Sequence, residues 1–120
     1  IDALKLMDLI VVVTTIDSFE LAALNDTLNT AELAKVPIVI VINRLHPQAN
    51  AEAARELLSE LGVPVCPVVM RERAIHRHAL ADGRTCLERE PFGAATREAR
   101  QLWEWLWSQL PSAEAQEGRR

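Results

Sequence analysis

The chain has 120 residues, 49% of them hydrophobic, which fits a single globular domain with a modest core. Its formal net charge of -4 excludes a protein whose whole surface coats nucleic acid. Positive charge is concentrated in residues 71–100, which carry seven arginines against five acidic residues, whereas residues 1–70 carry four basic and nine acidic residues.

Two strands and the helix between them are predicted in the first third of the chain. Residues 8–15 are a β-branched run bounded by polar residues, which is typical of a strand covered on both faces. Leucines at helical spacing, preceded by side chains that can cap a helix, predict a helix over residues 17–33. Pro37 stops this helix, and residues 38–42 are a second buried run of strand length.

A second helix and a third strand are predicted next. Residues 43–47 have the composition of a loop, and Asn50 can cap a helix whose apolar stripe runs to Gly62. Residues 63–70 (VPVCPVVM) predict a third strand, and its two prolines indicate an edge or irregular strand. Strands that alternate with helices predict an α/β fold, with a parallel sheet of about three strands and flanking helices.

The last part of the chain is expected to be helical. Residues 72–80 predict a short helix that ends near Gly83, and a last helix over residues 91–110 begins with a proline at its first position. Trp105 lies off the buried stripe of that helix, and residues 111–120 predict a disordered tail. The stripe itself consists of small and leucine side chains flanked by two tryptophans: Ala95, Ala99, Leu102, Leu106 and Leu110, with Trp103 and Trp107 beside them.

The start of the chain bears on whether the sequence is truncated, and its cysteines bear on the cellular compartment. Residues 1–7 have the character of a helix tail whose beginning is absent, so we expect the sequence to be truncated. Cys66 and Cys86 form no CxxC pair and follow no signal peptide, which favours a reducing cytoplasm. The longest apolar runs have strand length rather than the ~20 residues of a membrane helix, so we expect a soluble protein without membrane contact.

Polar side chains follow each predicted strand, at the edge where open parallel α/β sheets bind ligands. They lie in residues 14–17, 43–47 and 70–73. The amide of Asn43 offers a donor and an acceptor together, which suits the edge of a purine, while the alternative is that it only closes a turn. Guanine-specific NTPases carry NKxD at this place, and residues 43–46 (NRLH) lack its acid, which disfavours a GTPase.

The sequence contains no phosphate-binding loop. Such a loop needs clustered glycines so that successive N–H groups can face an anion at a helix N-terminus. The glycines here are scattered: Gly62, Gly83, Gly93 and Gly118. The chain alone should therefore bind no triphosphate tightly. His76 and His78 lie at no usual ligand spacing from the cysteines, which disfavours zinc.

One region of the chain is cationic. Arginine makes bidentate contacts with phosphate, so this region is a candidate nucleic-acid surface. The alternative is a solvated face neutralised by the acidic residues interspersed in it. The arginines of this region are Arg71, Arg73, Arg77, Arg84, Arg89, Arg97 and Arg100.

The order and spacing of these segments resemble the C-terminal portion of the ParA/MinD-type, deviant Walker partition ATPases, from about Leu4 to Leu110. LKLMDLIVVV is similar to the family's "ADLVLIPV" strand, DSFELAAL to the helix after it, and IVIVINR to the strand that ends in the base-contacting Asn. RERAIHRHALADGRTC resembles the arginine-containing helix with its "A-x-G-x-x-V" turn, and EPFGAATREARQLWEWL the closing helix. Thr14-Thr15 differs from the family, which has a proline there.

The resemblance implies that residues 1–110 are the C-terminal part of a P-loop NTPase-like three-layer domain, whose P-loop would precede Ile1. The parent would be an ATP hydrolase that uses ATP and Mg, and this chain alone would be inactive. Asn43 would contact adenine, and Arg44 and Arg71 would lie near the base pocket or dimer interface. The implied DNA-binding residues are Arg73, Arg77, Arg84, Arg97 and Arg100.

The implied partners are a second copy of the parent in its ATP state, non-specific DNA and a ParB-like centromere-binding protein, in the cytoplasm at the nucleoid. Two alternatives remain open. A stand-alone receiver-like or interaction module is disfavoured because neither Lys5 nor Lys35 follows a strand. A MinD-like membrane-cycling ATPase would end in a basic amphipathic helix, whereas the tail here is rich in Ser, Ala and Glu.

Overall fold

The computed structural model describes residues 2–111, so the tail predicted as disordered lies outside the described residues apart from Pro111. A 3-10 turn at Leu4–Leu6 is all that forms of the helix tail expected at the start of the chain. The other elements, in chain order, are β1 (Ile10–Thr14), α1 (Ser18–Glu32), β2 (Ile38–Ile42), α2 (Ala51–Ser59), α3 (Ala74–Ala81), α4 (Cys86–Arg89) and α5 (Ala94–Ser108). This arrangement confirms the predicted α/β class.

β1 and β2 form a parallel two-stranded sheet, joined by α1. The register pairs Ile10 with Ile38 and Thr14 with Ile42. β2 is the more deeply buried strand, and Ile40 and Ile42 have no exposed surface. Both strands are β-branched throughout, as expected where side chains pack on a pleated surface.

The predicted strand over residues 63–70 does not form as a regular strand. Residues 64–72 instead run beside β2 and are joined to it by isolated parallel bridges, Ile40 with Val65 and Leu45 with Arg71. The N–H of Ile40 donates to the Pro64 carbonyl at 2.8 Å, and Ile40 accepts from Cys66 at the same distance. Prolines have no N–H to donate, so two of them within four residues interrupt a regular ladder. We call residues 64–72 the bridged segment.

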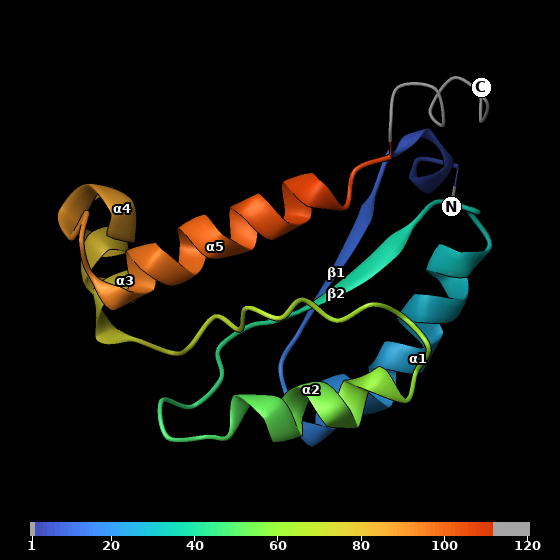
Figure 1. The fold of residues 1–120 in the computed structure, drawn as a ribbon, viewed down its shortest axis with the longest axis horizontal. Coiled ribbons are helices and arrows are strands. Elements are labelled where there is room, and N and C mark those ends of the chain that lie inside the picture. Colours follow the sequence, from blue (N-terminus) through green and yellow to red (C-terminus); the bar gives the residue numbers. More distant parts are fainter. Residues whose placement is uncertain (1, 112–120) are drawn as a thin grey trace.

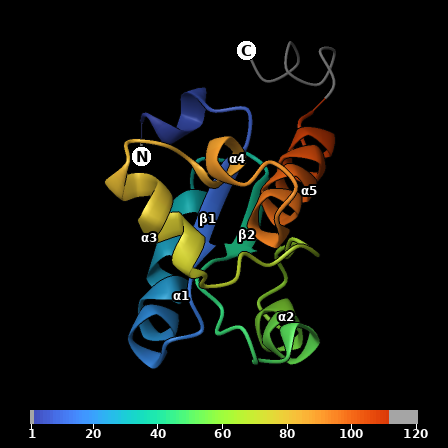
Figure 2. The same cartoon turned by 90° about the vertical axis from the view of Figure 1, so that its left-hand side faces the viewer.

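Helices lie on both sides of the strands (Figure 1). α1 and α2 occupy one side and α5 the other, while α3 and α4 lie beyond one end of the strands (Figures 1 and 2). Leucines from α1 and α2 pack with Ile10, Val12, Ile40 and Ile42 in the main core. Burying one such side chain stabilises the fold by about 1.5–3 kcal/mol, and this side of the sheet holds most of them.

The outer edge of β1 is open within residues 2–111, because β1 pairs only with β2 and the bridged segment lies on the far side of β2. Alternation along β1 buries Ile10, Val12 and Thr14 and leaves the two valines between them exposed. Val11 is 37% exposed and Val13 is 57% exposed. An apolar strand edge with no charge or bulge is therefore accessible to solvent.

The start of α5 differs from prediction, and a short helix, α4, precedes it. α5 begins after Gly93 and not at Pro91, because residues 91–93 form a turn that follows the unpredicted α4. α4 is short and begins with a capping box, in which the backbone N–H of Thr85 donates to Glu88 Oε1 at 3.0 Å.

The predicted stripe of α5 is buried at Ala95 and half-buried at its later positions, Ala99, Leu102, Leu106 and Leu110, and the tryptophans beside it face solvent. Trp103 and Trp107 are 63% and 65% exposed, and their rings contact each other with centroids 5.8 Å apart. Trp105, expected off the stripe, is half-buried instead. Burial in α5 is greatest at its start, at Ala95 and Thr96, where the helix lies beside α4 (Figure 1) and the Thr96 hydroxyl donates to the Cys86 carbonyl at 3.0 Å.

Candidate functional site

A cavity of about 560 Å³ lies beyond the carboxyl ends of β2 and the bridged segment. We call it the strand-end cavity. Its walls come from three parts of the chain: the loop after β2, the end of the bridged segment, and α3. It is lined by Asn43, Arg44, Met70, Arg71, Glu72, Arg73, His76, Arg77 and Leu80. Its volume is in the range of small-molecule sites, about 300–1,000 Å³.

Asn43 and Arg44 enter the cavity from the loop that follows β2. The backbone N–H of Asn43 donates to the Thr14 carbonyl at 2.8 Å, which continues the sheet by one residue. The Asn43 side-chain amide makes no hydrogen bond to any other residue of the described range 2–111 and lines the cavity. A donor and an acceptor are therefore available there to a ligand.

Arg44 has a left-handed backbone, with φ of 55°. This conformation costs a non-glycine residue about 1–2 kcal/mol, and such strain is concentrated at binding sites. Its guanidinium forms an ion pair with Glu72 at 3.5 Å, which joins the two loops across the cavity. Both side chains are largely exposed, so water weakens this pair.

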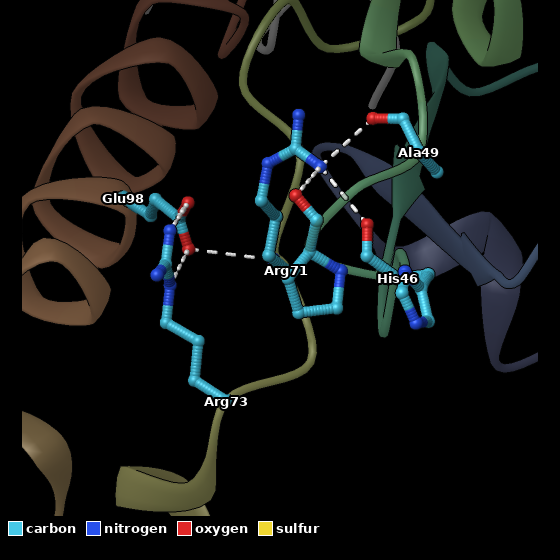
Figure 3. A network of polar contacts seen from close by, with 6 residues as sticks. His46, Ala49, Arg71, Arg73 and Glu98 are labelled. Carbon is cyan, nitrogen blue, oxygen red and sulfur yellow. Dashed lines mark hydrogen bonds and ion pairs between the residues drawn. The ribbon is translucent and has the colours of Figure 1, made fainter.

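Arg71 binds the backbone of the loop after β2 (Figure 3). Its Nη1 donates to the carbonyl oxygens of His46 at 3.0 Å, Pro47 at 3.2 Å and Ala49 at 2.9 Å. Because Nη1 carries two hydrogens, these three acceptors share them. The predicted nucleotide-binding residue thus also fixes the loop that begins with Asn43.

Arg73 is paired with Glu98 on α5 (Figure 3). Its Nε donates to Glu98 Oε1 at 3.2 Å and its Nη2 donates to Oε2 at 2.8 Å, a bidentate geometry. The two side chains are 30% and 16% exposed. The hydrogen bonds that Arg73 donates to Glu98 raise the pKa of Arg73 above its ordinary value, against the effect of its partial burial.

Glu98 was not among the predicted site residues. Besides Arg73, its Oε1 accepts the backbone N–H of Arg71 at 3.3 Å. In the sequence, Glu98 is marked only as an acidic residue at the border of the polar face of the last helix. In the structure, its neighbours are the exposed Arg97 and the half-buried Ala99. That position does not reveal a partner 27 residues away.

The predicted arginines fall into two groups. Arg44, Arg71, Arg73 and Arg77 line the strand-end cavity. The other predicted DNA-binding residues are exposed and do not line this cavity. Arg84 follows α3, and Arg97 and Arg100 lie on α5.

A second cavity, of about 360 Å³, lies beyond the carboxyl end of β1. Arg44 also lines this one, so its side chain stands between the two cavities. Asp17, Glu20 and His46 are the other charged or titratable residues of its wall. Two cavities that share Arg44 therefore lie along the strand ends, one beyond β2 and the bridged segment and one beyond β1.

Residues 2–111 were also compared with what a metal site, a reactive cysteine and a membrane helix require. No group of three or more His, Cys, Asp and Glu side chains in this range is arranged to hold a metal ion. Cys66 is fully buried, and burial raises the pKa of its thiol. None of the helices described in residues 2–111 has the length and apolar character needed to cross a bilayer.

No protein-family model matches the chain. The chain is similar to the translation initiation factor IF-2 of Amoebophilus asiaticus (strain 5a2), with 39% identity over 62 residues. The matched region covers 51% of this chain and 7% of the initiation factor. The chain thus spans only a small part of that relative's length, and this likeness does not by itself assign a family.

Proposed function

We propose that the chain is the C-terminal part of a ParA/MinD-type partition ATPase and that the strand-end cavity takes the adenine base of ATP. The observation that carries this proposal is the meeting of Asn43, Arg44 and Arg71 around one cavity at the ligand-binding edge of a parallel sheet. The bridged segment would then occupy the place of a third strand in a P-loop NTPase-like sheet, with helices in layers on both faces.

The lining of the cavity fits a purine base. The Asn43 amide can pair with the N6 amino group and the adjacent ring nitrogen of adenine, because it offers an acceptor beside a donor. Met70 and Leu80 supply apolar surface for the faces of the ring. Phosphate contacts and Mg would come from elsewhere in the parent, since the glycines of this chain are not clustered.

In the parent, this function includes ATP-dependent pairing with a second copy, non-specific DNA binding, stimulation by a ParB-like centromere-binding protein, and a place at the nucleoid. The exposed side chains of Arg77, Arg84 and Arg100 support the DNA part, because they can approach phosphate from solvent. Arg97 is also exposed, and its Nη1 donates to the Phe92 carbonyl at 3.0 Å. Arg73 contributes less to that surface, since its guanidinium is already engaged by Glu98.

A guanine nucleotide is the second candidate ligand, favoured by one observation. Residues 43–46 lack an acid, but Glu72 brings a carboxylate into the same cavity from the bridged segment. A carboxylate accepts well from the N1 and N2 hydrogens of guanine. In this structure Glu72 is paired with Arg44, and guanine would have to compete with that ion pair. Adenine needs only the unbonded amide of Asn43, so it is the preferred ligand.

Titration with AMP and GMP, followed by two-dimensional NMR of the 15N-labelled chain, tests the proposal. We expect AMP to bind with a Kd near 1 mM, about -4 kcal/mol, and to shift the signals of residues that line the cavity. Asn43→Ala should weaken AMP binding by about 0.5–1.5 kcal/mol, the value of one hydrogen bond. Asn29→Ala, which makes the same change at an exposed position of α1 away from the cavity, is the matched control.

Three outcomes of the titration are distinguishable. Stronger binding of GMP than AMP would select the guanine candidate. Failure of both nucleotides to bind at several millimolar, or AMP shifts confined to residues outside the cavity, would reject the base site. In a parallel titration with ATP and magnesium, low-micromolar affinity would show that the chain makes phosphate contacts that its sequence does not predict.

A further inference from the structure

We infer that Glu98 is a positioning residue, which sets the geometry of the strand-end cavity through Arg71 and Arg73 without touching the ligand. This inference rests on the proposed function, because it assigns a role to the same cavity. Glu98 lies on α5 and is not part of the cavity lining, so its effect on a bound base must be indirect.

The first step concerns the loop that carries Asn43. Beyond Asn43 the loop is tied to the bridged segment by two backbone bonds at Leu45, which donates to Met70 at 3.0 Å and accepts from Glu72 at 2.8 Å. Its outer part, residues 46–49, is held to that segment by the three hydrogen bonds from Arg71 Nη1. The position of Arg71 therefore determines where the outer loop lies.

The second step concerns what holds Arg71. Its backbone N–H donates to Glu98 Oε1, and the same carboxylate takes two hydrogen bonds from Arg73. One side chain of α5 thus holds Arg71 of the bridged segment and Arg73, the residue before α3, at the cavity wall (Figure 3). Bonds of a charged group are about twice as strong as neutral ones, and this carboxylate is mostly shielded from water.

The consequence is a path from α5 to the candidate base-reading amide: Glu98 holds Arg71, and Arg71 holds the loop that begins with Asn43. Asn43 is fixed at its backbone by Thr14, but the loop after it turns through the left-handed Arg44. A shift of residues 46–49 would be transmitted through that turn. A change at Glu98 should therefore alter how the Asn43 amide is presented to a ligand.

Glu98→Gln tests the inference, because glutamine keeps the size of the side chain and removes its charge. Glu104→Gln is the matched control, since it makes the same change on an exposed face of α5. In the absence of nucleotide, Glu98→Gln should shift the Asn43 side-chain amide signals and the backbone signals of residues 44–49. It should also weaken AMP binding about three- to tenfold, whereas Glu104→Gln should do neither.

Each result bears on the inference separately from the proposed function. Unchanged loop signals and unchanged AMP affinity in Glu98→Gln would overturn the inference even if the wild type binds AMP. If the wild type binds neither AMP nor GMP, the proposed function fails, and the signals of the nucleotide-free variant still decide whether Glu98 positions the loop. If Glu98→Gln does not fold, Arg73→Gln removes the partner of the same carboxylate, and unmoved signals of Arg71 and the loop in that variant overturn the inference.

Discussion

β1 offers its open edge and two exposed valines to a second copy of the chain, and replacing Val13 with lysine should prevent that association. Natural strand edges carry lysine, proline or a bulge that hinders pairing, and β1 carries none of these over Ile10–Thr14. Two such edges placed side by side would complete each other's backbone hydrogen bonds. We therefore expect the wild-type chain to self-associate as its concentration rises.

The strength of this association follows from the edge itself. Two five-residue strands would form about four backbone bonds, worth about 1 kcal/mol each. Val11 and Val13 are about half exposed, so burying the rest of each contributes about 1 kcal/mol per side chain, or about 4 kcal/mol for two copies. The loss of translational and rotational freedom opposes this by about 4 kcal/mol or more. The balance corresponds to a Kd near 1 mM.

Light scattering and sedimentation from micromolar to millimolar concentration measure this association. Val13→Lys should remove it, because two lysines would be brought together in the pair and one valine contribution per copy is lost. Leu33→Lys is the matched control, since it replaces another well-exposed apolar residue away from the strand edge. A wild-type chain that stays monomeric up to millimolar concentration, with a cooperative thermal transition, would refute the reasoning.

Two further predictions concern charge and burial. Replacing Arg84, Arg97 and Arg100 by alanine should weaken non-specific DNA binding and flatten its salt dependence by about 0.9 per lost phosphate contact, whereas Arg73→Ala should leave the slope unchanged. Filter binding at several salt concentrations measures both slopes, and equal slopes would contradict the DNA assignment. The thiol of Cys66 should resist alkylation until the chain unfolds. Burial raises the pKa of this thiol in the folded chain, so its contribution to the free energy of unfolding is complete below pH 9.0, the ordinary pKa of a cysteine, and is lost as the pH rises further. Rapid alkylation of the folded chain at neutral pH would contradict this.

The parts of the fold that were predictable have signals within a few residues. β2 forms over the predicted residues 38–42, because Pro37 and Asn43 bound a run that can be buried on both faces. α2 begins after Asn50 as predicted, and the Asn50 side chain accepts from the Ala53 N–H at 3.0 Å. Gly62 lies beyond its end with φ of 76°, a conformation that glycine adopts without strain.

The parts that were not predictable depend on distant residues or on very short elements. α4 has four residues, too few for a helical period, and its only local signal is the Thr85 and Glu88 capping box. The residues that line the strand-end cavity follow two predicted strands, so their meeting could be expected. The roles of Arg71 and Glu98 could not, since their partners are 22 to 27 residues away in the sequence.

The two edges of the small sheet are unequal, and this limits the size of any assembly that the sheet can form. Within residues 2–111, the bridged segment has no N–H to donate at Pro67, and the N–H of Val68 already donates to Cys66 Sγ at 3.4 Å. Another strand would find no regular row of partners there. Within the described part of the chain, β1 is therefore the usable edge. Pairing through one edge closes on itself as a two-fold dimer, whereas two usable edges would allow growth into open filaments.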